Sequence, residues 1–472
     1  MIRLLSAELF RLELRTRIPF RYGIATMTDV PQAILRATFE IDGRPETGLA
    51  ADVLPPKWFT KDPARQLADE ISEMLTVIRG AVTRARAVST PTAFRFWREL
   101  SAAQDAWGRE HKLPPLLVNF GTSFVERALI HAVCRANMAG FSAALRANIF
   151  GLELGLLHRG LAASAPRDWL PPAPSPQVFA RHTIGLSDPL EAADIAPGER
   201  VDDGLPQTLV ESIRFYGLRH FKIKINGEAA RDRDRLQRMA GTLAHECGDD
   251  YAFSLDGNES FRDVPSFADY ARQLMAVPGT SALWPHLLYI EQPWHRDMAL
   301  SPAIKLLERN WPDRPSIIID ESDAGIDSLP AALELGYNGT SHKNCKGVFK
   351  GVANACLLAQ RRVRGEPAVL SGEDLANVGP VALIQDLAAQ AALGVTSVER
   401  NGHHYFAGLA QFPRGWQEHA VARHHDLYVP TTAGWPRLDV RNGMLALGSV
   451  NAAPFGVPGE LDFSGIPVEV LA

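Results

Sequence analysis

Short apolar runs alternate with helix-like segments through the middle of the chain. Between about residues 178 and 410, eight runs rich in β-branched and aromatic residues recur at a nearly regular interval. They read VFARHTIGL, HFKIKI, YAFSLD, LLYIEQ, SIIIDE, NGTSHK, PAVLSG and GVTSVER. Stretches between them, such as EAARDRDRLQRMAGTLAHEC, are typical of helices. Strand and helix in alternation predict parallel βα units, and eight units in so short a span favour a closed barrel over an open sheet.

The pattern is different on both sides of this region. Residues 1–60 are strand-like and include the hairpin signal Asp42-Gly43, whereas residues 61–165 have the three- and four-residue apolar spacing of helices. The proline-rich stretch APRDWLPPAPSPQ cannot continue a helix. We therefore predict an α/β protein with three parts. These are an α+β domain with a helical insertion (1–170), a barrel (175–410) and a C-terminal segment that returns to the first domain (411–472).

Composition narrows the classes of function. The 472 residues exceed one ordinary domain, and a hydrophobic fraction of 46% with 22% charged residues is that of a globular protein. Lys and Arg number 49 against 54 Asp and Glu, a net charge of −5, which excludes a broad basic surface for nucleic acid. Charged residues interrupt every apolar run near the N-terminus, so we expect no signal peptide, no membrane segment and a cytoplasmic location.

Ionisable residues stand at the ends of five consecutive predicted strands. In chain order these are Lys222 and Lys224, Asp256, Glu291, Asp320, and Lys343. Active sites of such barrels lie at the C-terminal ends of the strands, so these side chains should share one rim. Alternating lysines alone are ordinary on an edge strand, and a lone acid at a strand end is commonly a helix cap. The joint pattern favours a functional site.

Three carboxylates at one rim would repel one another, and a divalent cation removes that conflict. Oxygen-only ligands suit a hard ion, so Mg²⁺ is the first choice, with Mn²⁺ or Ca²⁺ as alternatives. We expect the pKa of a lysine near this cation to fall, which makes the neutral amine a usable base. A metal that holds both oxygens of a substrate carboxylate would stabilise an enediolate, and a lysine on each face could remove or return the α-proton.

At this point the motifs resemble a known family. FKIKING, SLDGNES, YIEQPW, IIIDES and SHKNCKG are similar, in order and near spacing, to those of the enolase superfamily, closest to its muconate-lactonizing-enzyme-like and mandelate racemase members. IPFRYGIATMTDV is similar to the start of the family's capping domain. The resemblance implies a (β/α)7β-type barrel, an N-terminal α+β capping domain that selects the distal part of the substrate, and a homo-oligomer.

The resemblance also implies roles for individual residues. Asp256, Glu291 and Asp320 would be Mg²⁺ ligands. Lys224 and Lys343 would be opposing acid/bases, and Lys222 would be the electrostatic neighbour of Lys224. Asn258, Gln292 and Glu321 would orient the ligands or the lysines.

Other features are ambiguous or depart from the family pattern. His403, His404 and Glu373 are candidate substrate contacts, although surface or cap-contacting histidines and a helix-capping acid are equally consistent with the sequence. Lys346-Gly347-Val348 stands where the family normally has a Gly-Gly pair. There is no Asp-x-Asp after the eighth strand, where dipeptide-binding relatives hold an α-ammonium group.

The predicted function is that of a Mg²⁺-dependent isomerase or lyase that abstracts the α-proton of a small carboxylate substrate. Racemisation or epimerisation, cycloisomerisation and syn-dehydration all suit two opposed lysines. Acid-sugar dehydration by a His-Asp dyad is disfavoured, because neither His342 nor His403 has an assigned aspartate partner. The alternative is a family member that binds metal and carboxylate without catalysis. A nucleotide-dependent barrel lacks its phosphate-binding glycine motif.

Overall fold

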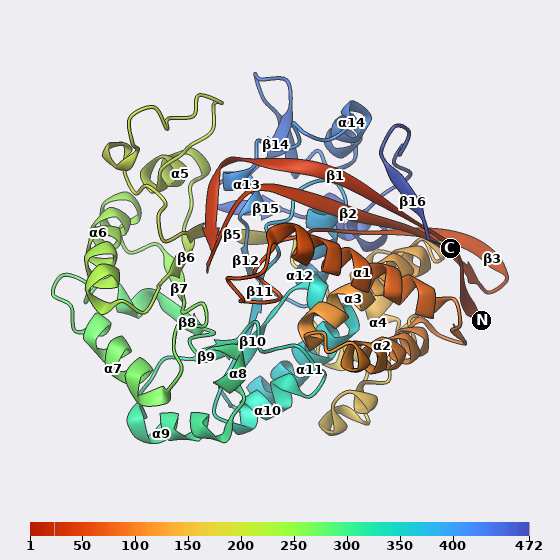
Figure 1. Cartoon of the computed structure of the whole chain (residues 1–472), viewed down its shortest axis with the longest axis horizontal. Helices are drawn as coiled ribbons and strands as arrows, with labels where there is room; N and C mark the ends of the chain where they lie inside the picture. The colour runs from red at the N-terminus through yellow and green to blue at the C-terminus, as the bar shows by residue number, and fades with distance from the viewer. Residues whose placement is uncertain (23, 472) are drawn as a thin grey trace.

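The computed structural model describes residues 1–22 and 24–471, which form an antiparallel sheet, a group of helices and a parallel barrel (Figure 1). Strands β1 (Ile2–Tyr22), β2 (Ala25–Ile41) and β3 (Arg44–Val53) pair in that order, and both β4 (Ser89–Thr90) and β16 (Val468–Val470) pair with β1. Asp42 and Gly43 have φ of 50° and 80°. Positive φ at both positions is what a type I′ turn requires, so the predicted hairpin is confirmed.

Four helices follow this sheet in the chain and are called the cap helices below; the first three pack against the sheet, and the fourth packs against α12 (Ala382–Ala392) of the barrel. They are α1 (Leu67–Ala85), α2 (Ala93–Glu110), α3 (Pro115–Ala136) and α4 (Phe141–Arg146). Helix α3 contacts the sheet on one side and the barrel loop 344–346 on the other. It is buried on all its faces because it lies between these two parts of the molecule.

Eight parallel strands form the barrel, and the pairing of the last with the first closes it. They are β5 (Gln177–Ile184), β6 (His220–Lys224), β7 (Ala252–Asp256), β8 (Leu287–Glu291), β9 (Ile317–Ile319), β10 (Gly339–His342), β11 (Val369–Gly372) and β12 (Ser397–Glu399). The predicted fold class, an α/β barrel with an N-terminal antiparallel-sheet cap, is confirmed.

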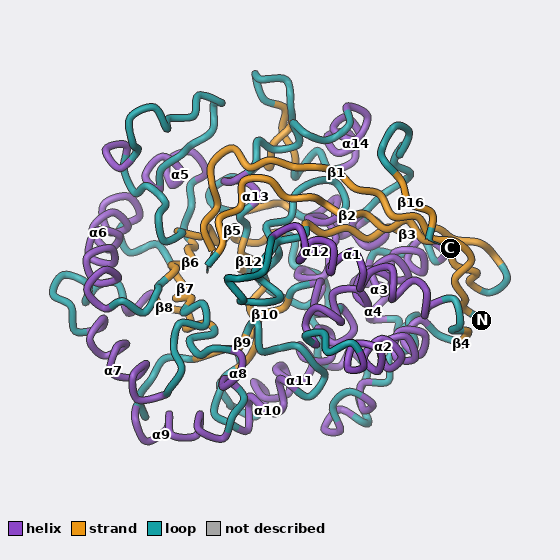
Figure 2. Tube along the Cα trace, in the orientation of Figure 1, coloured by secondary structure: helices purple, strands orange, loops and turns teal. Residues whose placement is uncertain are grey.

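Helices connect the barrel strands and cover their outer face, as Figure 2 shows for α6, α7 and α9. In chain order they are α5 (Leu209–Tyr216), α6 (Ala229–Cys247), α7 (Val264–Met275), α8 (Arg296–Ala299), α9 (Leu306–Asn310), α10 (Ser328–Glu334), α11 (Val348–Val363) and α12 (Ala382–Ala392). Within the described residues, no helix has the length and apolar character needed to cross a membrane.

The last seventy residues add no parallel strand to the barrel. They form α13 (Gly402–Tyr405), α14 (Arg414–Arg423), β13 (Tyr428–Pro430), β14 (Pro436–Leu438), β15 (Met444–Ala446) and α15 (Gly448–Ala452) before β16. Strand β15 pairs antiparallel with the first barrel strand, and β16 pairs with the first strand of the chain. The C-terminal segment thus contacts both sheets.

Candidate active site

Strand register places the predicted residues at one level of the barrel. Lys224 pairs with Asp256 on the next strand, and Asp256 pairs with Glu291 on the strand after that. Asp320 and Lys343 directly follow β9 and β10. Because parallel strands present their C-terminal ends on the same side, all five side chains reach one end of the barrel.

These side chains belong to a larger buried cluster of charges. Its carboxylates are Asp256, Glu291, Asp320, Glu373 and Glu399, and its cations are Arg181, Lys222, Lys224, Lys343 and Lys346. Five acids and five bases balance formally. Buried charges are costly unless they are paired, and here each charge has a partner.

Lys222 is at the centre of the cluster. Its Nζ lies 2.9 Å from Glu291 Oε1, 3.1 Å from Glu373 Oε2 and 3.0 Å from Glu399 Oε2. Lys343 Nζ donates to Asp320 Oδ2 at 2.6 Å and also to Glu373 Oε2, at 2.9 Å. One oxygen of Glu373 therefore accepts hydrogen bonds from two lysines whose strands, β6 and β10, stand on opposite sides of the eight-stranded barrel.

Three members of the cluster were not predicted from the sequence. Arg181 pairs with Glu373 at 3.2 Å, and Lys346 pairs with Asp320 at 3.0 Å. Glu399 completes the set through Lys222. Arg181 and Glu399 lie opposite each other in the pairing of β5 with β12. The sequence does not show that Arg181 and Glu399 are neighbours, because their strands are far apart in the chain and pair only when the barrel closes.

Without a bound metal, the lysines are held in their charged form. Burial alone lowers the pKa of Lys343, but the Asp320 and Glu373 carboxylates outweigh it and the pKa lies well above its usual value. The pKa of Lys224 is shifted in the same direction. Burial lowers this pKa, but the Asp256 charge raises it by more, so the pKa lies above its usual value. We expected a lowered lysine pKa from the sequence. The direction is the opposite here because carboxylates, rather than a cation, are the nearest charges.

The donor set fits a hard divalent cation. Carboxylate oxygens of Glu291, Asp320 and Glu373 lie within 4.8 Å of one another, and all three residues are buried. Glu291 Oε2 is buried and has no hydrogen-bond partner among the described residues. Burial and the Glu373 charge raise the pKa of Glu291 well above its usual value. A cation would satisfy this oxygen and relieve the repulsion, and oxygen ligands suit Mg²⁺.

Asp256 is placed somewhat differently from the other two expected ligands. Its Oδ2 accepts from Lys224 Nζ at 2.5 Å, and its Oδ1 accepts from the backbone N–H of Asn258 at 2.8 Å. The compact carboxylate triad thus contains Glu373 in the position where we expected Asp256. The assignment of Asp256 as a metal ligand stays a prediction.

Of the residues expected to orient the site, Gln292 contacts the backbone of an expected metal ligand, whereas the side chain of Asn258 contacts the cap. Gln292 Oε1 accepts from the backbone N–H of Asp320 at 2.7 Å, while its Nε2 donates to Ser322 Oγ at 2.7 Å. Asn258 Oδ1 accepts from Lys61 Nζ at 3.0 Å, which links the cap to the barrel rim. Both residues have positive φ, 46° for Asn258 and 35° for Gln292, a backbone conformation that costs energy and recurs at functional sites.

Glu321 is the third residue of that group. It is buried, and its Oε2 has no hydrogen-bond partner among the described residues. Burial, together with the neighbouring Asp320 charge, raises the pKa of Glu321 to about 7. Glu321 also lines the cavity above the cluster.

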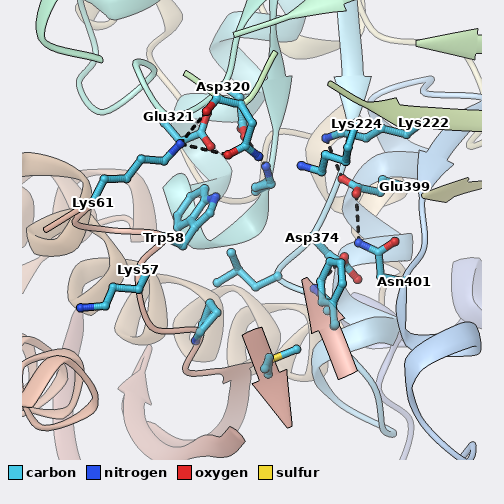
Figure 3. Close-up of a pocket in the computed structure, with 17 residues that line it drawn as sticks. Lys57, Trp58, Lys61, Lys222, Lys224, Asp320, Glu321, Asp374, Glu399 and Asn401 are labelled. Atoms are coloured by element: carbon cyan, nitrogen blue, oxygen red, sulfur yellow. Dashed lines mark hydrogen bonds and ion pairs between the residues drawn. The ribbon is translucent and has the colours of Figure 1, made fainter. Parts of the chain in front are cut away.

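A cavity of about 580 Å³ opens above the cluster, between the barrel rim and the cap (Figure 3). Its polar wall includes Lys222, Lys224, Asp320 and Lys343. An apolar part of the wall comes from the cap and the loop after β11: Phe20, Met27, Pro55, Trp58, Leu375 and Ala376. Lys343 Nζ lies 5.1 Å from the centroid of the Trp58 ring, a cation–π distance, so a cap side chain contacts a predicted base.

The two remaining candidates, His403 and His404, lie outside this cavity. His403 Nε2 is 3.1 Å from His182 Nδ1, and His403 lines a different cavity of about 330 Å³. Glu373 lies beneath the cavity floor, bonded to the lysines. None of the three lines the cavity wall, so their expected contact with a substrate in this cavity has no support from its lining.

Comparison with known proteins supports the fold. No family model matches the chain, and no curated protein matches it. Among solved structures, a dipeptide epimerase from Cytophaga hutchinsonii, complexed with Mg and the dipeptide D-Ala-L-Val, is 14% identical with a TM-score of 0.60 and full coverage of both chains, 100% and 100%. A mandelate racemase/muconate lactonizing protein from Herpetosiphon aurantiacus is 14% identical, with a TM-score of 0.59 over 96% of this chain and 98% of that one.

A third similar structure is an enolase from Bradyrhizobium complexed with magnesium and mandelic acid. It is 15% identical, with a TM-score of 0.55 over 89% of this chain and 98% of that one. At such identities the similarity concerns the fold. The chain has the fold of these enolase-superfamily proteins, as the motifs led us to expect.

Proposed function

We propose that this protein is a Mg²⁺-dependent enzyme that removes and returns the α-proton of a small carboxylate substrate. The observation that carries the proposal is the convergence of Lys224 and Lys343, from opposite sides of the barrel, on one cavity floored by buried carboxylates. The similar proteins from Cytophaga hutchinsonii and Bradyrhizobium were crystallised with magnesium and with a dipeptide or mandelic acid. Their ligands are carboxylates, which supports the class of substrate.

The charge balance of the cluster suits this chemistry. Five carboxylates and five cations are neutral together, so a divalent cation would leave the site with two positive charges. Glu291, Asp320 and Glu373 or Asp256 would hold the cation, which when bound would stabilise the negative charge that develops on the substrate carboxylate. The carboxylate group of a substrate would cancel one of these charges, and the lysine that acts as base would remove the other when it is in its neutral form.

The lysines supply the proton transfers. Lys224 Nζ is hydrogen-bonded to Asp256, and Lys343 Nζ to Asp320 and Glu373, so each ammonium group has a fixed position before substrate enters. A lysine in its neutral form takes the α-proton from one face, while the protonated lysine opposite returns it to the other face. Such two-base transfer suits racemisation or epimerisation. Cycloisomerisation and syn-dehydration need one lysine as base and the other as a charge partner.

The apolar wall indicates the rest of the substrate. Phe20, Met27 and Trp58 from the cap face the charged floor across the cavity. The cap lysines do not add a free cation here: Lys61 Nζ is paired with Glu259 at 2.8 Å, and Lys57 Nζ with Glu70 at 3.2 Å. We therefore expect the carboxylate of the substrate to lie at the rim and an apolar group to extend towards the cap.

Exchange of the substrate α-hydrogen in D₂O tests the proposal directly. With Mg²⁺ and a panel of carboxylates that carry apolar distal groups, proton NMR should show loss of the α-signal for at least one member. Lys343→Ala should reduce this exchange by at least about a hundredfold, the lower end of what one acid/base group contributes. The variant should still bind Mg²⁺, as measured by calorimetry.

Lys305→Ala is the matched control, because Lys305 is exposed on the outside of the barrel and should leave exchange unchanged. Wild-type exchange in Lys343→Ala would contradict the assignment of that lysine. Carboxylate and Mg²⁺ binding without exchange across the whole panel would support the non-catalytic alternative instead.

A further inference from the structure

A second large cavity lies at the seam between the cap helices and the barrel. It has a volume of about 810 Å³. Helices α2 and α3 form one side, and the loop before α10 and the start of α11 form the other, which Figure 1 shows as neighbours at the lower right. It has no lining residue in common with the active-site cavity. Nothing in the proposed function uses this space.

Two carboxylates at this cavity have no partner. Asp105 comes from α2 and Asp327 from the loop that precedes α10, so they belong to opposite sides. Among the described residues, neither side chain receives a hydrogen bond or lies within ion-pair distance of a cation. Burial raises the pKa of Asp105, and the nearby Arg109 charge offsets this effect only in part, so a carboxylate partly removed from water is incompletely stabilised.

The two lysines that line the cavity already form ion pairs with acidic residues outside its lining. Lys346 Nζ pairs with Asp320 at 3.0 Å, and Lys350 Nζ pairs with Asp323 at 2.9 Å. Glu126, a third acid of the lining, uses both oxygens to accept backbone N–H groups. The cavity therefore presents a net negative charge to whatever occupies it.

A buried hydroxyl group and an aromatic ring also belong to the lining of this cavity. Ser101 is 8% exposed, and its Oγ has no hydrogen-bond partner among the described residues. A buried polar group without a partner is uncommon in native proteins and is commonly satisfied by a ligand or water. Trp97 lies one helical turn before Ser101 and also lines the cavity, where an indole ring can contact a cation or the methylene groups beside it.

We propose that this cavity binds a linear diamine or polyamine. Two unpaired carboxylates on separate elements call for two positive charges held apart, which a chain of methylenes between ammonium groups provides. A single metal ion needs ligand atoms close together. In the described part of the chain, the compact group of three or more potential ligands is the one at the active site, not here. Ammonium N–H groups also satisfy Ser101, and the methylenes pack against Trp97.

The inference does not depend on the proposed enzymatic activity, and a binding measurement tests it. Spermidine titrated into the full-length protein, with Mg²⁺ present and at low ionic strength, should give saturable one-site binding by calorimetry. Affinity should fall as salt is added, because the attraction is between charges that salt screens. Putrescine should bind more weakly than spermidine, and butylamine, with one charge, should bind weakest.

Variants locate the site. Asp105→Asn and Asp327→Asn should each lower spermidine affinity about threefold to tenfold, the range expected for one carboxylate–ammonium contact. Asp327 is exposed, so Asp327→Asn should fold normally even if Asp105→Asn does not. Asp269→Asn is the control: this exposed acid pairs with Arg272 on α7, and its loss should not change binding.

Three results would overturn the inference. They are the absence of saturable binding, wild-type affinity in both cavity variants, and equal affinities for spermidine and butylamine. The second result would assign any binding to the general negative charge of the protein, and the third would remove the argument from two separated carboxylates.

Discussion

At the scale of single residues, the unusual feature is the number of charged side chains buried in one cluster. Glu373 is fully buried, yet Lys222, Lys343 and Arg181 hold its pKa well below the usual range against the opposing effect of burial. The same carboxylate thus fixes the positions of two lysines and an arginine. The sequence motif presented it only as an acid after a strand, which is a common place for a helix cap.

Glu373→Gln should destabilise the folded protein by about 2 to 4 kcal/mol, because three buried cations lose the charge that they share. The free energy of unfolding from guanidinium titration, at neutral pH and without Mg²⁺, is the measurement. The amide keeps the size and one acceptor of the carboxylate, so the change reports mainly on charge.

Glu8→Gln is the control for that variant. Glu8 pairs with Arg36 at 2.7 Å, but both side chains are about one-third exposed. We expect a loss below about 1 kcal/mol, as is typical of surface pairs. Equal losses in the two variants would contradict the importance given to Glu373.

At the scale of elements, helix α3 connects the cap to the barrel. Glu126 on α3 accepts the N–H of Val348 at 3.0 Å and that of Phe349 at 2.7 Å. These are the first two residues of α11, whose N–H groups have no partner inside the helix. A residue of the cap therefore caps a helix of the barrel, across more than two hundred positions of sequence.

We predict that Glu126→Ala lowers the free energy of unfolding by about 2 to 3 kcal/mol, because two buried N–H groups lose their acceptor at a helix N-terminus. Chemical denaturation measures this. Glu110→Ala, at the exposed end of α2, should cost less than about 0.5 kcal/mol. If Glu126→Ala also lowered the free energy of unfolding by less than about 0.5 kcal/mol, water would be shown to replace the carboxylate as acceptor for the two N–H groups.

At the scale of the whole molecule, many histidines are buried in their neutral form. Burial lowers the pKa of His131 to about 3, and that of His182, His220, His342 and His424 to about 4. His131 joins three distant segments, since it lies on α3, accepts the backbone N–H of Leu49 and contacts the carbonyl oxygen of Val457.

This distribution makes stability depend on pH in a definite direction. Each of these groups has a folded pKa below the unfolded value of 6.5, so the unfolded chain binds more protons once the pH falls below that value. Their contribution is fully present above about pH 6.5 and is lost as pH falls towards the folded pKa, by up to about 1.4 kcal/mol per pH unit for each histidine.

We therefore predict that the free energy of unfolding falls steeply as the pH is lowered from about 6.5 to about 5. Guanidinium titration at each pH measures this free energy. His131→Gln should make the slope shallower, although the variant is less stable at neutral pH. His245→Gln should leave the slope unchanged, because that side chain is 80% exposed. A slope that neither variant alters would assign the pH dependence to other groups.

Much of the barrel and of its rim could be predicted from the sequence. The eight strands follow from local apolar runs, and Lys224, Asp256, Glu291, Asp320 and Lys343 follow from strand ends, because both properties belong to short stretches of chain. The hairpin at Asp42-Gly43 is local in the same way. The direction of the lysine pKa shifts was not predictable, since it depends on which charges lie nearest in space.

What the sequence by itself determined is the periodicity of the elements and the kind of chemistry that their ends carry. The tertiary structure alone decided which charges meet. Closure of the barrel brings Arg181 and Glu399 to the same centre, and docking of the cap sets Trp58 over Lys343. The physical reason is that a buried charge is stabilised by whatever partner the fold places within a few ångströms, and separation along the chain carries no information about that distance.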